Sequence, residues 1–249
     1  MSVLTDITRS TIGTKLLNGL TGLLLCGFIV AHLLGNLLLL LGSEAFNTYA
    51  YTLHSLGHGA LVPIAEVGLV VLFGAHAASG ISVALTRRRA RPYSYKKRAN
   101  AGGKSHKSAS STSMIITGGV LLVFVITHVA QFRGGFFAPR EHADVMVNGH
   151  ATHDLYALVV DWFNHAPTVG LYIAVMLLLG THLRHGFWSA FQSLGATNPK
   201  YMPIIHRVGI AFAVIMTFGF LMIPIYIFLF VDPVAGGTLI GGQHPVVGR

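Results

Sequence analysis

The chain has 249 residues, of which 53% are hydrophobic and only 10% are charged. Soluble domains carry about 25% charged residues, so this composition excludes an ordinary soluble enzyme and predicts an integral membrane protein. The net charge of +9 is better explained by basic loops on the cytoplasmic side of a membrane than by nucleic-acid binding. The single cysteine, Cys26, lies in an apolar run, so we expect no disulfide within the chain.

Five runs of uncharged, mainly apolar residues are each long enough to cross about 30 Å of hydrocarbon as a helix. In chain order, we expect spans at about residues 16–42, 61–86, 113–132, 168–191 and 203–231. The first run is too long to be a cleavable signal peptide. The sequence therefore predicts an all-α, polytopic membrane protein whose residues 1–249 form a single membrane domain.

Basic residues are concentrated after the second span, where residues 87–107 hold nine of the 17 Lys and Arg residues. Cytoplasmic loops are enriched in Lys and Arg, so we expect the basic loop at 87–112 to be cytoplasmic. Five spans then place the N-terminus in the cytoplasm and the C-terminus outside. The Gly-rich residues 232–249 are expected to form an extended outer tail.

The chain contains 14 histidines. Eight of them lie in expected loops, where we predict exposed side chains: His54, His58, His106, His142, His150, His153, His165 and His244. His206 is expected at the membrane interface. The remaining five lie within spans: His32, His76, His128, His182 and His185. An ionisable residue inside a membrane span indicates a functional site unless a structural partner explains it.

Each of the first four spans carries such a histidine, which suits two haems with two imidazole ligands each. His32 follows Lys15 by a helical rise of roughly 25 Å, and His128 lies close to Arg133, so both belong in the outer half of the membrane. His76 lies roughly 16 Å before Arg87, in the inner half.

The inner end of the fourth span also carries His182, so depth pairs His32 with His128 and His76 with His182. Small residues near the histidines would leave room for a porphyrin, although close packing of helices uses small residues as well. These include the run 77–80, Gly35 and Gly186. Because His182 lies deeper than His185 and one turn from Gly186, we expect it to be the ligand, with His185 near a haem propionate or water.

Several stretches carry a family resemblance in chain order over about residues 15–230: NGLTGLLLCGFIVAHLLGN with GSEAFN, FGAHAASGI with ARPYSY, TGGVLLVFVITHV, and THLRHGFWSAFQSLG. With these, the chain resembles the single-chain di-haem cytochrome b membrane anchor of bacterial succinate:quinone oxidoreductases, the succinate dehydrogenase and fumarate reductase family. The resemblance implies a four-helix bundle around two b haems, with the fifth helix alongside. It also implies axial ligands at His32 and His128 for the outer haem, and at His76 and His182 for the inner haem.

The resemblance further implies two partner subunits, a flavoprotein that oxidises succinate and an iron–sulfur protein docked on the cytoplasmic face of the bacterial inner membrane. Electrons would pass through the inner haem and the outer haem to a quinone. The chain has neither a flavin motif nor a cysteine set for a cluster, so it would serve the enzyme only as a subunit, without the succinate-oxidising site.

The quinone site is open between two positions. Quinone chemistry coupled to proton transfer needs a titratable or hydrogen-bonding group at the membrane edge. Glu66 is expected at the outer end of the second span, and related enzymes with an outer menaquinone site use an acid near this level. A plain interfacial acid would look the same. An inner site near Trp188 and His185 is the competitor.

Two other classes of protein remain open. The di-haem cytochrome b subunit of a formate dehydrogenase or membrane hydrogenase would have similar histidines but a different catalytic partner. A transporter with a histidine proton relay would have broken helices and intramembrane carboxylates, of which the spans offer only Glu66. A reduced-minus-oxidised spectrum separates the transporter from the cytochromes, and the copurifying subunits separate the two cytochromes.

Overall fold

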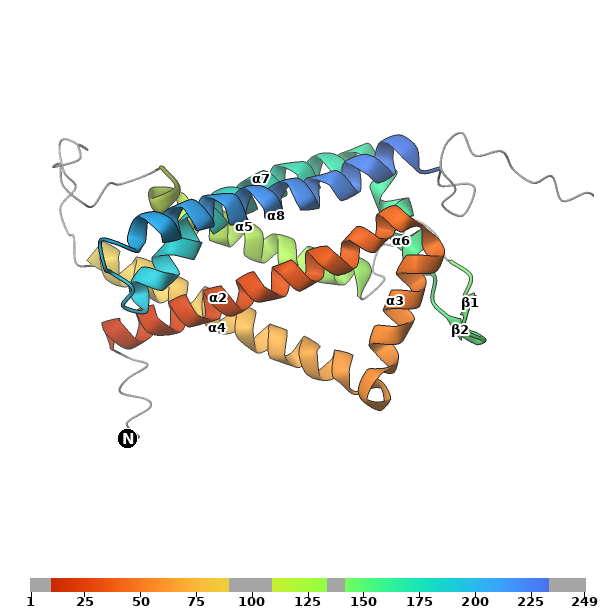
Figure 1. Cartoon of the computed structure of the whole chain (residues 1–249), viewed down its shortest axis with the longest axis horizontal. Coiled ribbons are helices and arrows are strands. Elements are labelled where there is room, and N and C mark those ends of the chain that lie inside the picture. Colours follow the sequence, from red (N-terminus) through yellow and green to blue (C-terminus); the bar gives the residue numbers. More distant parts are fainter. Residues whose placement is uncertain (1–9, 90–108, 134–141, 233–249) are drawn as a thin grey trace, which may run out of the picture. The chain divides into compact units, whose positions relative to one another are not determined.

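The computed structural model describes residues 10–89, 109–133 and 142–232 (Figure 1). These residues are almost entirely helical. The helices are α2 (Thr11–Asn36), α3 (Ser43–Ser55), α4 (Leu61–Arg89), α5 (Ala109–Phe132), α6 (Leu155–Phe163), α7 (Ala166–Ser193) and α8 (Met202–Phe230). Most of the predicted basic loop and nearly all of the predicted outer tail lie outside the described residues.

In the part of the chain that the structure describes, five helices are long and apolar enough to cross a membrane. They cover Thr11–Leu41, Leu61–Arg89, Ser113–Phe132, Ala166–Ser193 and Met202–Phe230. The prediction of an all-α membrane protein with five spans is therefore confirmed. The first span starts earlier than expected because Ser10 caps the helix: its hydroxyl accepts a hydrogen bond from the Gly13 N–H at 2.9 Å.

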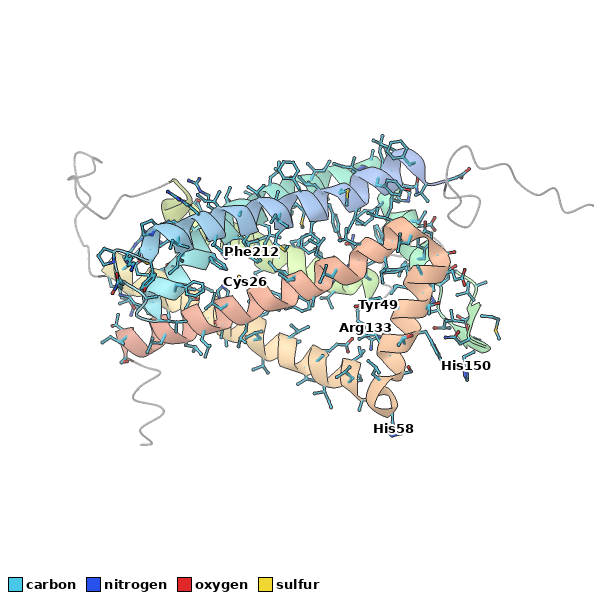
Figure 2. The ribbon with its side chains drawn as sticks, in the orientation of Figure 1. Cys26, Tyr49, His58, Arg133, His150 and Phe212 are labelled. Atoms are coloured by element: carbon cyan, nitrogen blue, oxygen red, sulfur yellow. The ribbon has the colours of Figure 1, made fainter. Side chains whose placement is uncertain are left out.

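The connection between the first two spans contains a helix where the sequence analysis expected a loop. A short 3-10 turn, Leu37–Leu41, follows α2, and Gly42 then leads into α3 with φ 101°, a value that favours glycine. Helix α3 follows and ends near Gly57 and His58, whose φ angles are also positive. Figure 2 shows His58 at this second turn, ahead of α4.

The connection between the third and fourth spans contains short structure, as expected. Strands β1 (Val145–Val147) and β2 (His150–Thr152) pair antiparallel. Asn148 and Gly149 form the turn with positive φ at both residues, which suits a tight hairpin. Helix α6 then begins after Asp154, whose carboxylate accepts a hydrogen bond from the Ala157 N–H at 2.9 Å.

A buried asparagine joins α3 to α6. The side-chain amide of Asn47, which is 3% exposed, donates to the Asp154 carboxylate at 2.9 Å. Its oxygen accepts from the Tyr156 N–H at 3.0 Å. One side chain therefore satisfies polar groups at the start of α6 that would otherwise be buried without partners.

The chain divides into two compact units, and every one of the five spans contributes residues to both. The first unit comprises residues 1–30, 65–124 and 177–217, and the second comprises residues 31–64, 125–176 and 218–249. Their charges differ in sign. Among the described residues, seven Lys and Arg side chains and one carboxylate belong to the first unit, against one Arg and five carboxylates in the second.

Candidate functional site

The first unit brings together His76 from α4 and His182 from α7. Their ring centroids lie 6.4 Å apart and their planes are inclined at 72°. Both side chains are half-buried. The pair formed is the one that depth in the membrane predicted, although the two residues are far apart in the sequence.

A Thr-Gly dipeptide on a neighbouring helix contacts each ring of this pair. The hydroxyl of Thr21 on α2 lies 3.3 Å from Nδ1 of His76. A Cβ at Gly22 would lie 3.2 Å from Cε1 of the same ring. A side chain on the glycine would therefore press on the imidazole.

The second dipeptide repeats this arrangement on α5. The hydroxyl of Thr117 lies 3.2 Å from Nδ1 of His182. A Cβ at Gly118 would lie 3.4 Å from Cε1 of that ring. Both threonines are 5% exposed, so the threonine end of each hydrogen bond is buried.

The second unit brings together His32 from α2 and His128 from α5. Their ring centroids lie 5.9 Å apart and their planes are perpendicular. Aromatic side chains surround the pair: Phe220 lies 6.0 Å from His32, and Phe132 lies 5.2 Å from His128, measured between ring centroids. This is again the pair that depth predicted.

Polar side chains contact both rings of the second pair. Nδ1 of His128 lies 3.0 Å from the hydroxyl of Tyr172, which donates to the side-chain oxygen of Gln131 at 2.9 Å. The amide of Asn36 lies 3.4 Å from both ring nitrogens of His32 and donates to the His32 carbonyl at 2.8 Å. The ring of His128 therefore has a tyrosine hydroxyl as its polar neighbour, whereas the ring of His32 has an asparagine amide.

The geometry of both pairs fits a haem held between two imidazoles. An imidazole nitrogen binds a transition metal at about 2 Å, so two axial imidazoles on one iron have ring centroids roughly 6 Å apart. The measured separations are 6.4 and 5.9 Å. Within residues 10–89, 109–133 and 142–232, no group of three or more His, Cys, Asp or Glu side chains could hold a metal ion. Among the described residues, each pair thus offers a metal two imidazoles and no third ligand from His, Cys, Asp or Glu.

The glycines do not all serve the purpose that the sequence analysis gave them. A Cβ at Gly35 would come within 2.5 Å of the Tyr49 hydroxyl. Gly35 therefore admits the side chain of Tyr49, which extends from α3 (Figure 2), against α2. A Cβ at Gly186 would meet only Met114, at 3.9 Å. The glycines that contact the histidine rings lie on the facing helices instead.

His185 belongs to neither histidine pair. Its ring lies 4.9 Å from that of Trp188, which in turn lies 4.5 Å from the ring of His206. Nδ1 of His185 is buried and has no hydrogen-bond partner among the described residues. These three aromatic side chains, the His185–Trp188–His206 cluster, join α7 to α8. Glu66 lies in the second turn of α4, is half-buried, and belongs to neither histidine pair.

One of the eight loop histidines does not have the exposed side chain that was expected. His142 is half-buried rather than exposed, and its Nε2 lies 3.2 Å from a carboxylate oxygen of Asp161, whose side chain is 4% exposed. His54, His58, His150, His153 and His165 are exposed as expected. His106 and His244 lie outside the described residues.

The polar side chains that contact the imidazole rings individually have no distinctive sequence signal. Thr21, Thr117 and Tyr172 are ordinary residues of apolar helices when only the sequence is known. The available signal was the dipeptide Thr-Gly, which occurs in the first span and again in the third.

Comparison of the chain with models of protein families, with curated proteins and with solved structures finds no match. The features of the chain that bear on its function are therefore the two histidine pairs, their surroundings and the distribution of charge.

Proposed function

We propose that the chain is the membrane-anchor cytochrome b subunit of a succinate:quinone oxidoreductase. In this role it passes electrons from an iron–sulfur subunit through two b haems to a quinone. The observation that carries the proposal is the pair of two-histidine sites, with ring separations of 6.4 and 5.9 Å, inside helices apolar enough to cross a membrane.

His76 and His182 would hold one haem, and His32 and His128 the other. Haem bound between two imidazoles supplies one-electron transfer without opening a coordination position to substrate. The protein would contribute the ligands, an apolar surrounding that excludes water, and hydrogen bonds that orient the rings. Four helices each supply one ligand, so each haem would join two helices.

The charge distribution supports a cytoplasmic position for one end of the bundle. Basic residues predominate in the first unit, which also contains the His76–His182 pair. Lys and Arg are retained on the cytoplasmic side of bacterial inner membranes. The iron–sulfur and flavoprotein subunits of the proposed enzyme would dock there, so the His76–His182 haem would receive electrons first.

The quinone, proposed to be menaquinone, has two candidate sites on this chain. Glu66 offers a carboxylate in the second turn of α4. The His185–Trp188–His206 cluster offers aromatic surface and a buried ring nitrogen without a hydrogen-bond partner among the described residues. That nitrogen is a specific observation in favour of the second site, because a quinone carbonyl could accept a hydrogen bond from it.

A spectrum and a subunit analysis test the proposal. The purified protein should give the reduced-minus-oxidised spectrum of low-spin b haem, and a pyridine-haemochrome assay should find about two haems per chain. The absence of haem would leave a histidine-relay transporter as the better explanation. Copurification with formate dehydrogenase or hydrogenase subunits, in place of succinate dehydrogenase subunits, would overturn the assignment of the partner.

A further inference from the structure

The two Thr-Gly dipeptides of the first unit contact the two imidazoles in the same way. Thr21 and Gly22 on α2 contact Nδ1 and Cε1 of His76, and Thr117 and Gly118 on α5 contact Nδ1 and Cε1 of His182. In both cases a dipeptide on one helix contacts the same edge of a ring that belongs to another helix.

The threonine hydroxyls have a defined direction of hydrogen bonding. A hydroxyl carries one proton. That of Thr21 is donated to the carbonyl oxygen of Leu17 at 2.7 Å. That of Thr117 is shared between the carbonyl oxygens of Ser113 and Met114, both at 3.2 Å. Carbonyl oxygens can only accept, so these bonds use the proton of each hydroxyl.

The threonine oxygens can then only accept from the imidazoles. Nδ1 of His76 and Nδ1 of His182 must therefore carry the ring proton, because a hydrogen bond to an oxygen that has already donated requires an N–H. A neutral imidazole has one protonated nitrogen. Its Nε2 is consequently the unprotonated atom in both residues, which is the form that binds a metal.

We propose that Thr21 and Thr117 are positioning residues that fix His76 and His182 in the tautomer protonated at Nδ1 and so present Nε2 to the haem iron. This inference rests on the proposed function, because it assigns a role to the threonines only if the pair binds haem. Gly22 allows the ring of His76 to approach closely enough for its bond, whereas a Cβ at Gly118 would make an ordinary van der Waals contact with the ring of His182.

The bonds should also tune the bound haem. An imidazole that donates from Nδ1 to an oxygen acceptor is a more basic ligand at Nε2, and such outer partners raise metal affinity by roughly 10- to 100-fold. A more basic ligand favours ferric over ferrous iron. Removal of either hydroxyl should therefore raise the reduction potential of one haem and weaken its binding.

The chain offers a matched control beside one of the ligands. Thr181 precedes His182 in α7, and its hydroxyl donates to the Leu178 carbonyl at 2.8 Å. Its side chain is exposed. Thr181→Val thus removes a threonine hydroxyl that donates to a backbone carbonyl of the helix of His182, and this hydroxyl bonds to no imidazole among the described residues.

The test is a redox titration of the intact complex that carries Thr21→Val, Thr117→Val, the two Thr→Ser variants or Thr181→Val. Each Val variant should raise the midpoint potential of one haem and shift its low-spin ferric resonance signal. The Ser variants, which retain the hydroxyl, and Thr181→Val should match the parent protein. Where a Val variant does not accumulate, Thr→Ala at the same position carries the same expectation.

Failure of the proposed function and failure of the positioning role give different results. If the parent protein binds no haem, the proposed function fails. If the parent binds two haems and the Val or Ala variants keep its potentials, the proposed function stands and the positioning role is overturned. Ser variants that change the potential as much as Val variants would likewise overturn it, because the effect would then come from packing and not from the hydroxyl.

Discussion

Single residues of α7 differ sharply in their surroundings over one helical turn. His182 lies beside His76, whereas His185 lies beside Trp188. We predict that His182→Ala reduces haem content from about two per chain to about one, because an iron without an axial ligand binds weakly in an apolar pocket. His185→Ala should keep both haems. A pyridine-haemochrome assay of the two variants checks this, and the reverse pattern would contradict the ligand assignment.

The glycine that faces His76 gives a second test at the residue scale. Gly22→Ala places a Cβ 3.2 Å from Cε1 of His76, so the ring must move by a few tenths of an ångström. We predict weaker binding of one haem, measured as loss of haem during detergent washing. Gly27→Ala on the same helix is the control, because a Cβ there meets nothing within 4 Å. Equal loss from both variants would show that the effect belongs to the helix and not to the contact.

The quinone site can be located by single substitutions at the two candidates. We predict that Glu66→Gln lowers succinate:quinone turnover and leaves both haems bound, because the variant loses a titratable group needed for proton transfer. Trp188→Leu, assayed in parallel, tests the His185–Trp188–His206 cluster. Normal turnover in Glu66→Gln together with reduced turnover in Trp188→Leu would place the quinone at the cluster.

At the scale of elements, the link between α3 and α6 depends on one side chain. Asn47→Ala removes the partner of the Tyr156 N–H and one partner of the Asp154 carboxylate. We predict a loss of about 1–3 kcal/mol in the free energy of unfolding, the cost of leaving buried polar groups without partners.

Thermal unfolding of the protein in detergent measures this loss. Thr52→Ala on α3 is the matched control, because its hydroxyl is exposed and donates only to the Thr48 carbonyl of its own helix. The control should change stability by less than about 0.5 kcal/mol. An equally small effect of Asn47→Ala would mean that α3 and α6 are held by their apolar contacts.

The five spans could be predicted from sequence because length and lack of charge are sufficient to identify a membrane helix. Helix α3 was missed because its polar positions, such as Asn47, resemble those of a loop until their partners are known. The histidine pairs could be predicted because depth along a span is proportional to residue number. Thr21 and Thr117 were missed because depth does not give the direction in which a side chain points around the helix axis.

At the scale of the whole molecule, the sign of charge distinguishes the two units. We predict that residues 87–107, with nine basic residues, face the cytoplasm. Single cysteines placed in this segment on a Cys26→Ser background should react with a membrane-impermeant thiol reagent in inside-out vesicles. Reaction only in right-side-out vesicles would reverse the assigned orientation of all five spans.

The two histidine pairs interleave along the chain, since His76 lies between His32 and His128, and His128 lies between His76 and His182. During synthesis, both histidines of the His32–His128 pair are therefore present once the third span has been made. The partner of His76, His182, is present only after the fourth span has been made. Any contiguous segment that contains both histidines of one pair also contains a histidine of the other pair. The proposed His32–His128 centre could therefore be completed during synthesis before the proposed His76–His182 centre.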